Sequence, residues 1–320
     1  MTGTHVLVTG GLGYIGSALL PRLQANDDVA ELTVLDSLAS GSPRTLLEAR
    51  LDDAFRFRRG DVRTYGEVET AMDDVDVVIH LAAITGADST RDRREETMAV
   101  NRDGTENVLR AAEKRGVDRV VFASSCNNYG RTASRDIAET DEMDPLNPYA
   151  ESKVRSEDLL AEYADRGLET TALRMSTNYG YAPGVRYNLV VNYFVFRAVV
   201  GLPLTVYGDG SNWRPFVHVR DAARAFASAA LEPDRWPQQV YNVGHNDANY
   251  RIGEIADIVS EVVAPVDVTY LEDENPGPSY HVNFDRVAAT GFEPHWTLRE
   301  GVDELATVLR EAADPLDTHE

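Results

Sequence analysis

The feature that most constrains the fold is a glycine-rich turn near the start of the chain. The run Thr9-Gly10-Gly11-Leu12-Gly13-Tyr14-Ile15-Gly16 follows a short apolar segment at 5–9 and precedes a segment of helical periodicity at 17–24. A strand–turn–helix unit of this kind gathers backbone N–H groups at the positive end of a helix dipole. Glycine lets the backbone turn sharply and come close to a ligand. The spacing therefore predicts an α/β unit whose turn binds phosphate.

Apolar runs of strand length alternate with helical stretches through the first half of the chain. Strands are predicted at 32–36, around Phe55 and Phe57, at 75–81, 119–124 and 169–174, and helices at 101–115 and 149–165. Strict alternation of this kind predicts a parallel sheet with helices on both faces.

After about residue 175 the alternation breaks down, because proline and glycine interrupt the pattern. A predicted helix at 221–231 and a strand at 240–243 then return to the sheet. We expect an α/β fold with a doubly wound parallel (Rossmann) sheet, made of residues 1–174 with 219–243. Residues 175–218 and 244–312 are expected to form a smaller C-terminal lobe.

The charge balance limits the possible partners. The chain carries 53 Asp and Glu against 31 Lys and Arg, a net charge of −22, so nucleic acid and anionic lipid are not expected partners. Replacement of Lys by Arg (only Lys114 and Lys153 remain) favours a protein from a high-salt cytoplasm, where screening relieves self-repulsion. An acidic proteome encoded by a GC-rich genome is the alternative.

Other classes are also disfavoured by composition. Apolar runs fall short of the roughly 18–20 residues that span a bilayer, and the N-terminus lacks a basic region, so we expect a cytoplasmic protein. Cys126 is the only cysteine, which excludes an internal disulfide and a cysteine zinc cluster, and no metal site is predicted.

Asp36 ends the second predicted strand, 20 residues after Gly16. A carboxylate there can accept hydrogen bonds from ribose hydroxyls and would repel a 2′-phosphate, which favours NAD over NADP. Further strand ends, at Asp61-Val62 and Leu81-Ala82-Ala83, would line the same crevice. The predicted cofactor-binding residues are Gly10, Gly13, Tyr14, Ile15, Gly16, Asp36, Ser37, Asp61, Val62, Leu81, Ala82, Ala83, Asn101, Tyr149 and Lys153.

Tyr149 and Lys153 stand four residues apart on a predicted helix, hence on one face. A free tyrosine has a pKa of about 10, and a neighbouring ammonium lowers it, so the phenolate can act as a base. This spacing is common by chance, but a chain that uses Arg almost everywhere keeps Lys here. Ser125, at the end of the fifth strand, could donate to the substrate oxygen, or it could merely satisfy nearby backbone.

Together these residues resemble the extended short-chain dehydrogenase/reductases, specifically the NAD-dependent epimerase/dehydratase family that includes UDP-galactose 4-epimerase. The resemblance covers roughly residues 4–310. The matching motifs are the glycine turn, Asp36, Asp61-Val62, His80-Leu81-Ala82-Ala83, Ser124-Ser125 with Tyr129-Gly130, Pro148-Tyr149 with Lys153, Leu173-Arg174 before Tyr179-Gly180, Val206-Tyr207-Gly208-Asp209-Gly210, Arg214-Pro215-Phe216-Val217-His218-Val219, Tyr241-Asn242-Val243-Gly244 and Gly291-Phe292-Glu293-Pro294.

The resemblance implies an NAD-dependent enzyme whose C-terminal lobe binds a nucleotide sugar. It makes Ser125, Tyr149 and Lys153 the catalytic residues and Arg214 a partner of the substrate pyrophosphate. It implies substrate contacts at Ser125, Thr177, Asn188, Tyr207 and Arg214. It also implies a homodimer, in which helices near 97–115 and 149–165 pack as a four-helix bundle.

Departures from the family pattern bear on the reaction. Sugar-nucleotide dehydratases and decarboxylases usually carry an acidic residue two places after the catalytic Ser/Thr, and Asn127 at that position cannot act as a general acid. Thr177 replaces a common Asn and Pro215 a common Asp, which leaves the substrate open. Cys126 is interpreted as a buried residue that packs in the core, although related enzymes use a cysteine one place further along the chain as a catalytic acid or base.

Three hypotheses about function remain. The first is a nucleotide-sugar 4-epimerase, of the UDP-glucose/UDP-galactose type, that keeps NAD bound and acts through a transient keto-sugar. The second is an NAD-dependent dehydrogenase or 4-keto reductase of a sugar or nucleotide sugar, with exchangeable cofactor. The third is a non-catalytic dinucleotide sensor, against which the presence of both Tyr149 and Lys153 argues.

Overall fold

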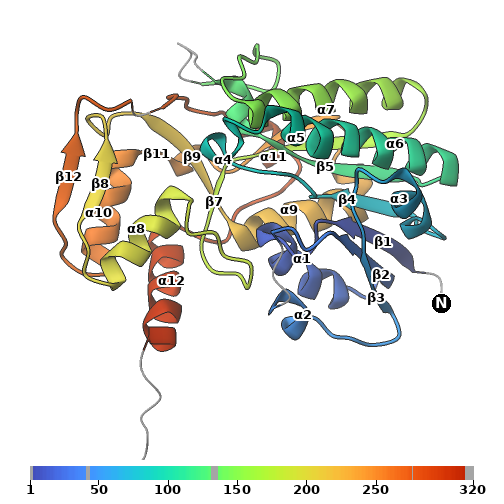
Figure 1. Ribbon diagram of the computed structural model, residues 1–320, viewed down its shortest axis with the longest axis horizontal. Coiled ribbons are helices and arrows are strands. Elements are labelled where there is room, and N and C mark those ends of the chain that lie inside the picture. The colour runs from blue at the N-terminus through green and yellow to red at the C-terminus, as the bar shows by residue number, and fades with distance from the viewer. Residues whose placement is uncertain (1–2, 41–43, 131–135, 276, 314–320) are drawn as a thin grey trace, which may run out of the picture.

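In the computed structural model, which describes residues 3–40, 44–130, 136–275 and 277–313, seven parallel strands form one sheet (Figure 1). The strand order is β10-β6-β5-β4-β1-β2-β3, so the chain starts in the middle and winds outward in both directions. The doubly wound Rossmann sheet predicted from the alternating pattern is confirmed. Its strands are β1 (Thr4–Thr9), β2 (Val29–Asp36), β3 (Phe55–Arg59), β4 (Val77–His80), β5 (Arg119–Ser125), β6 (Glu169–Met175) and β10 (Val240–Val243).

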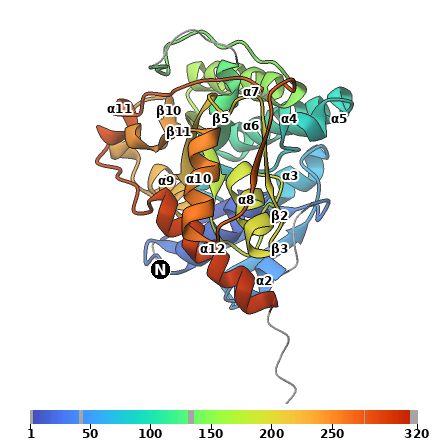
Figure 2. The same cartoon turned by 90° about the vertical axis from the view of Figure 1, so that its left-hand side faces the viewer.

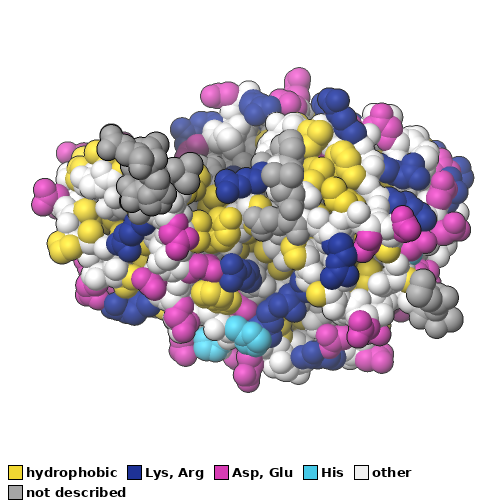
Figure 3. Space-filling model, turned by 90° about the horizontal axis from the view of Figure 1, so that it is seen from below, with side chains coloured by type: hydrophobic (Ala, Val, Ile, Leu, Met, Phe, Trp, Pro, Cys, Tyr) yellow, Lys and Arg dark blue, Asp and Glu magenta, His cyan; other side chains and the backbone are white. Residues whose placement is uncertain are grey.

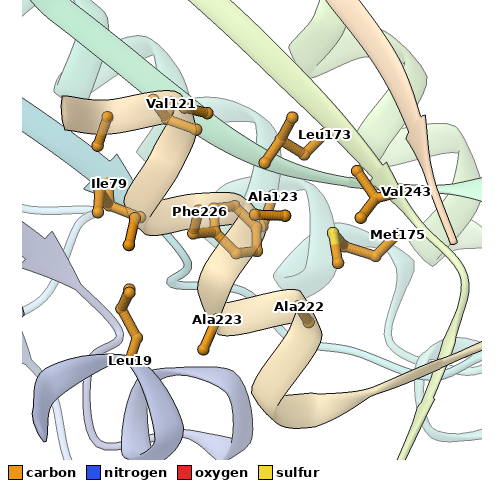
Figure 4. Close-up of a cluster of buried hydrophobic side chains, with 14 of the residues drawn as sticks. Leu19, Ile79, Val121, Ala123, Leu173, Met175, Ala222, Ala223, Phe226 and Val243 are labelled. Atoms are coloured by element: carbon orange, nitrogen blue, oxygen red, sulfur yellow. The ribbon is translucent and has the colours of Figure 1, made fainter. Parts of the chain in front are cut away.

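Helices cover both faces of this sheet, because its strands are apolar on both sides. One face packs against α1 (Tyr14–Gln24) and α9 (Val219–Leu231), with Phe226 at the centre of the apolar cluster shown in Figure 4. The other face packs against α3 (Tyr65–Ala71), α6 (Gly104–Arg115) and α7 (Pro148–Asp165). All seven carboxyl ends of the parallel strands therefore meet at one open edge, where ligands bind in such sheets.

The helix predicted at 101–115 begins earlier and is interrupted. It consists of α5 (Arg94–Met98), a π-helical turn η1 (Ala99–Asp103) and α6. The carbonyl oxygen of Asn101 accepts hydrogen bonds from the hydroxyls of Thr105, on α6, and Ser156, on α7. These side-chain donors compete with the regular helical ladder, which is how a π-turn is sustained.

Between β6 and the return of the chain with α9, and again after β10, lies a smaller lobe. Its apolar centre lies among α8, α10 and α12, which pack side by side in Figures 1 and 2. Its elements are β7 (Thr177–Tyr179), α8 (Val190–Val199), β8 (Leu204–Tyr207), β9 (Trp213–His218), β11 (Asn249–Arg251), α10 (Ile252–Val262), β12 (Val268–Leu271) and α12 (Leu298–Ala313). β7, β9 and β11 form one small sheet, and β8 pairs with β12.

One segment departs from the predicted division of the chain. Residues 280–292, which include α11 (Asp285–Ala288), contribute Val282, Phe284 and Phe292 to the core of the large sheet. Val282 also forms an isolated parallel bridge with Ile137. This stretch therefore lies against the large domain, although it follows β10 and precedes α12.

The remaining elements are short: α2 (Arg44–Glu48), α4 (Ala87–Thr90), η2 (Cys126–Tyr129), η3 (Pro233–Arg235) and η4 (Asn246–Ala248). Basic and acidic side chains lie next to one another on the face seen in Figure 3. None of the helices in the described ranges is long and apolar enough to cross a bilayer. Within the same ranges, His, Cys, Asp and Glu form no group that could hold a metal ion.

Candidate active site

The glycine turn leaves no room for side chains at two of its positions. Gly10 has φ +69°, and a Cβ built on it would lie 2.6 Å from the Cα of Ala82. A Cβ on Gly16 would overlap the carbonyl of Gly11. Leu81 and Ala82, which follow β4, lie against the turn because their N–H groups donate to the carbonyl and the hydroxyl of Thr9. The turn and the end of β4 thus form a side-chain-free cradle at the N-terminus of α1, as a dinucleotide pyrophosphate requires.

Asp36, at the end of β2, holds two loops beside this cradle. Its carboxylate accepts hydrogen bonds from the backbone N–H of Leu12 at 3.0 Å and of Leu38 at 2.8 Å. Leu38 adopts φ 62°, so this bond also stabilises a strained backbone position. The adjacent Ser37 accepts a long bond, 3.4 Å, from Ala39. Asp36 therefore fixes the glycine turn and keeps a carboxylate at the position where a ribose would lie.

Several predicted cofactor residues face away from the cradle or are engaged by protein groups. The hydroxyl of Tyr14 donates to the carbonyl of Gly180, at 2.5 Å, and accepts from Asn192, so it ties the turn to the lobe. Ile15 packs into the core. Asp61 forms a 2.6 Å ion pair with Arg63.

Two more of them support the loops that would line the site. Val62 is buried in the core, where its side chain packs against Gly104. Asn101 is also buried, and its amide bonds to both the N–H and the carbonyl of Ile84 and to Ser152. Asn101 thereby positions the loop that carries Ala83 against α7. The polar atoms of its own side chain are thus already paired within the protein.

Ser125, Tyr149 and Lys153 come together at the open edge of the sheet. Asn147 caps α7 by accepting from the N–H of Ala150, and this brings Tyr149 into the first turn of the helix. The Tyr149 phenol is hydrogen-bonded to Ser125, which lowers its pKa, but burial has the larger effect and raises it. Lys153, one turn further on, lies with its ammonium 5.9 Å from the centre of the Tyr149 ring.

Lys153 is almost completely buried and lies 4.5 Å from the centre of the Phe122 ring. Burial lowers its pKa to about 7, and the carboxylate of Glu157 acts in the opposite direction. His80 lies nearby, and burial together with the Lys153 charge lowers its pKa to about 3, so it is a neutral scaffold residue between Thr9 and Thr105.

A buried ion pair anchors α7, the helix that carries Tyr149 and Lys153. Glu157 of α7 and Arg174 of β6 are joined at 2.7 Å, with both side chains nearly inaccessible. Ser124 and Asn128 also donate to the Glu157 carboxylate. This network fixes α7 against the end of β5, and so sets the position of Tyr149 relative to Ser125.

The predicted substrate residues occupy the lobe side of the same edge. Thr177 lies two residues beyond Met175, which pairs with Ser125 across β5 and β6. Arg214 lies with its guanidinium 4.9 Å from the centre of the Tyr280 ring, and an Nη1 atom donates to the carbonyl of Trp213. Tyr280 interacts electrostatically with both Arg214 and Tyr149, and so links the lobe arginine to the catalytic phenol.

Two other predicted substrate residues are more peripheral. Asn188 reaches to 3.9 Å from a Cβ built on Gly86, in the loop after β4. Tyr207 is exposed at the end of β8, beside Leu271 of β12, and the described contacts link it to none of the groups around Tyr149. Cys126 is buried, and its thiol contacts the carbonyl of Arg174, in agreement with its interpretation as packing.

The structure adds Thr85, Arg186 and Tyr280 to the site. Arg186 belongs to the irregular segment before α8 and donates to the hydroxyl of Thr85. Its positive charge lowers the pKa of Tyr149. Neither a motif nor a periodicity marks these residues in the sequence. Thr85 follows β4, whereas Arg186 and Tyr280 reach the site only because the 180–189 and 277–283 segments return over the sheet edge.

The pattern of the NAD-dependent epimerase/dehydratase family matches residues 6–244, about three quarters of the chain. The chain belongs to this family. The resemblance inferred from its motifs is confirmed. NAD is accordingly the cofactor, and the cradle around Gly10 and Gly16, with Asp36 beside it, fits such a group.

Members of the family with different reactions are about equally similar to this chain. A dTDP-glucose 4,6-dehydratase from Actinoplanes sp. is 33% identical over 95% of the chain and 97% of its own length. The solved structure of a UDP-N-acetylglucosamine 4-epimerase from Methanobrevibacter ruminantium, in complex with UDP-N-acetylmuramic acid, is 28% identical. It has a TM-score of 0.85 and covers 96% of this chain and 100% of that one.

A UDP-glucose 4-epimerase from Thermus thermophilus, solved with NAD, is also 28% identical, with a TM-score of 0.82 over 97% of this chain and 100% of that one. The present chain is therefore an enzyme of the NAD-dependent epimerase/dehydratase family, of the extended short-chain dehydrogenase/reductase type.

Proposed function

We propose that the protein is a nucleotide-sugar 4-epimerase, with Ser125, Tyr149 and Lys153 as its catalytic residues. The observation that carries this proposal is the composition of the site around Tyr149. Its phenol is influenced by Ser125, Arg186 and Cys126, and none of the described carboxylates is among the groups that shift its pKa. The site thus offers a single proton-transfer group for a carbinol carbon, which suits hydride chemistry without elimination.

Elimination or decarboxylation in this family needs a second acid near the reacting carbon. Asn127, at the position where that acid is expected, accepts a hydrogen bond from the amide of Asn147 and has no titratable proton. The neighbouring Cys126 thiol is buried, and burial raises its pKa, so it does not supply a thiolate. The side chains at 126 and 127 thus leave Tyr149 without a partner for removing water.

In the proposed reaction, Arg214 holds the substrate pyrophosphate while the sugar lies between Ser125 and Tyr149. The Tyr149 phenolate, stabilised by the Lys153 ammonium, removes the proton of the 4-hydroxyl as the carbon becomes a ketone. Ser125 donates to the carbonyl oxygen. NAD, when bound, would supply the hydride acceptor and donor for that carbon. The keto-sugar rotates to present its other face while its pyrophosphate stays bound to Arg214. Tyr149 then returns the proton to the oxygen.

For the cofactor, we propose that the backbone around Gly10, Gly13 and Gly16 holds the pyrophosphate and that Asp36 holds the adenosine ribose. Asp61 and Val62 would meet the adenine, and Ala82 and Ala83 would lie along the dinucleotide. Lys153 would bind the nicotinamide ribose in addition to its role at Tyr149.

A product analysis separates the candidate reactions. Purified enzyme is incubated with UDP-glucose, UDP-galactose and their dTDP and GDP counterparts without added NAD, and products are identified by mass and NMR. A product of unchanged mass with inverted C4 supports the epimerase. Loss of water would overturn it, and turnover only with added NAD, with loss of two hydrogens, would establish the dehydrogenase.

We also propose that the enzyme is a homodimer and is adapted to high salt. α6 and α7 pack side by side on one face of the sheet, as the four-helix bundle of two copies would require. Light scattering in molar salt should give twice the monomer mass, and a monomer at all protein concentrations would exclude the dimer. The net charge of −22 predicts that the melting temperature rises with KCl, and a flat salt profile would exclude salt adaptation.

A further inference from the structure

Arg186 connects the lobe to the loop after β4, within electrostatic range of the catalytic tyrosine. Its segment closes over the glycine turn, because the N–H of Gly184 donates to the Ser17 hydroxyl at 3.0 Å. One Nη atom of Arg186 donates to the hydroxyl of Thr85, and the other lies 3.7 Å from a Cβ built on Gly86. Its charge lowers the pKa of Tyr149. The guanidinium therefore lies at the loop after β4, in a segment that packs on the glycine turn, and within electrostatic range of the Tyr149 phenol.

This guanidinium has no carboxylate partner. Two other enclosed arginines are paired, Arg174 with Glu157 at 2.7 Å and Arg224 with Asp221 at 2.8 Å. Arg214, to which the substrate pyrophosphate is assigned, has no carboxylate within ion-pair distance in the described part of the chain. Among the described residues, likewise, no Asp or Glu lies within ion-pair distance of Arg186. Burial lowers the pKa of Arg186, and only the phenols of Tyr149 and Tyr14 oppose this effect. An enclosed cation without a counter-charge is costly because it loses solvation that nothing replaces, which indicates that a ligand supplies the anion.

The pyrophosphate groups of cofactor and substrate have other partners. The turn at the start of α1 serves the first, and Arg214 serves the second. Arg186 and Arg214 are not part of each other's electrostatic surroundings, and each is linked to Tyr149 from a different side, Arg214 through Tyr280. An anion at Arg186 must therefore belong to the part of the substrate that reaches Tyr149, which is the sugar ring.

The donors of Arg186 also match one kind of anion. One Nη atom is used by Thr85, while Nε and the other Nη have no hydrogen-bond partner in the described residues. That edge of a guanidinium presents two parallel N–H groups, which fit the two oxygens of a carboxylate.

We infer that Arg186 binds a carboxylate on the sugar, and that the natural substrate is a nucleotide-activated acidic sugar such as a uronic acid. In a hexuronic acid the carboxylate is attached to C5, next to the reacting C4, so one side chain can hold it while Tyr149 acts on the neighbouring hydroxyl. This inference rests on the proposed function, because it places the sugar C4 at Tyr149.

The test compares binding of matched acidic and neutral ligands to the holoenzyme by calorimetry. The pairs are UDP-glucuronic acid with UDP-glucose, and GDP-mannuronic acid with GDP-mannose. Because both members of a pair carry the same nucleotide, the ratio of their Kd values reports on the sugar alone. Wild type should bind the acidic member of one pair at least about 10-fold more tightly. Arg186→Gln should abolish that preference, and Arg186→Lys should restore part of it. The control is Arg91→Gln, which removes an exposed charge on the same side of the molecule and should keep the preference.

Equal binding of acidic and neutral sugars by wild type would overturn the inference, as would a preference that survives Arg186→Gln. Weakened binding of all four ligands by Arg186→Gln, with the ratio unchanged, would assign Arg186 to the shared nucleotide or cofactor and also overturn it. Product analysis of the same samples tests the proposed function separately. A preference for the acid that depends on Arg186, together with a product that is not the C4 epimer, would support the acidic-sugar site and reject the epimerase.

Discussion

The ammonium of Lys153 lies 5.9 Å from the centre of the Tyr149 ring, inside the protein and out of contact with water. The cation that should stabilise the phenolate is thus itself destabilised by burial, which lowers the pKa of Lys153 to about 7. Because burial also raises the pKa of Tyr149, proton transfer at neutral pH depends on charges that arrive with the ligands.

Lys153→Met should stabilise the cofactor-free protein while abolishing activity. In the unfolded chain the lysine titrates at about 10.4, above its pKa of about 7 in the fold. Between these pH values the unfolded state holds a proton that the folded state lacks, so the wild-type free energy of unfolding rises with pH. The variant lacks this penalty, and should be more stable at pH 6 by about 3–5 kcal/mol. The difference should vanish near pH 10.

Urea unfolding at both pH values measures this effect. The control is Lys114→Met, since Lys114 is exposed and forms a 2.6 Å ion pair with Glu69. Its loss should bring no gain at pH 6. If Lys153→Met and Lys114→Met changed stability alike, Lys153 would not carry a burial penalty.

Gly16→Ala should abolish cofactor binding and destabilise the fold, since a Cβ there would overlap the Gly11 carbonyl. The expected loss is about 2 kcal/mol or more, as for other overpacked sites. Gly66→Ala is the matched control, because a Cβ on Gly66, in α3, meets nothing within 4 Å. It should leave NAD binding intact and stabilise the protein by about 0.5–1 kcal/mol. Thermal unfolding and NAD titration of both variants give the comparison, and an Ala at position 16 that binds NAD normally would contradict the cradle.

Asp36→Ala should weaken NAD binding and relax the discrimination against NADP. The side chain holds Leu12 and Leu38 at 3.0 and 2.8 Å, so its removal loosens the loops as well as removing the ribose acceptor. We expect the Kd for NAD to rise about 10- to 100-fold, with a smaller change for NADP. Asp36→Asn keeps an acceptor oxygen without the charge. If both variants kept the wild-type ratio of NAD to NADP affinity, Asp36 would serve only to brace the loops.

Glu157→Gln should be strongly destabilising, because it leaves the Arg174 guanidinium buried without a counter-charge. The expected loss is about 3–5 kcal/mol in denaturant unfolding. Glu162→Gln, on the exposed side of the same helix, should cost less than about 0.5 kcal/mol. Equal, small losses for the two variants would show that the buried network does not hold α7 in place.

The fold could be predicted from the sequence because it depends on local and periodic signals. The turn at Gly10–Gly16 specifies its own backbone, and the alternation of apolar strands with helices restricts the sheet to a parallel one. Boundaries were less predictable. The helix expected at 101–115 is interrupted by a π-turn, because Asn101 and Thr105 form bonds that depend on α7 being in place.

The candidate site could be predicted only where residues lie close in sequence or follow successive strands. Tyr149 and Lys153 share a helix face, and the ends of parallel strands always meet at one edge, so Ser125 and Asp36 could be placed there in advance. Tyr14 and Asn101 were expected at the cofactor, but their polar groups are used by Gly180, Asn192, Ile84 and Ser152. Such pairings across distant segments have no local sequence signal.

By itself, then, the sequence determined the strand–turn–helix cradle, the parallel sheet and the spacing of the catalytic pair, since short-range geometry fixes all three. Tertiary structure alone decided what surrounds that pair. It buried Lys153 enough to lower its pKa, it brought Tyr280 within electrostatic range of both Arg214 and Tyr149, and it held Arg186 at Thr85, within electrostatic range of the phenol. Burial and charge pairing are sums over the whole packed chain, so they exist only once the lobe has folded over the sheet.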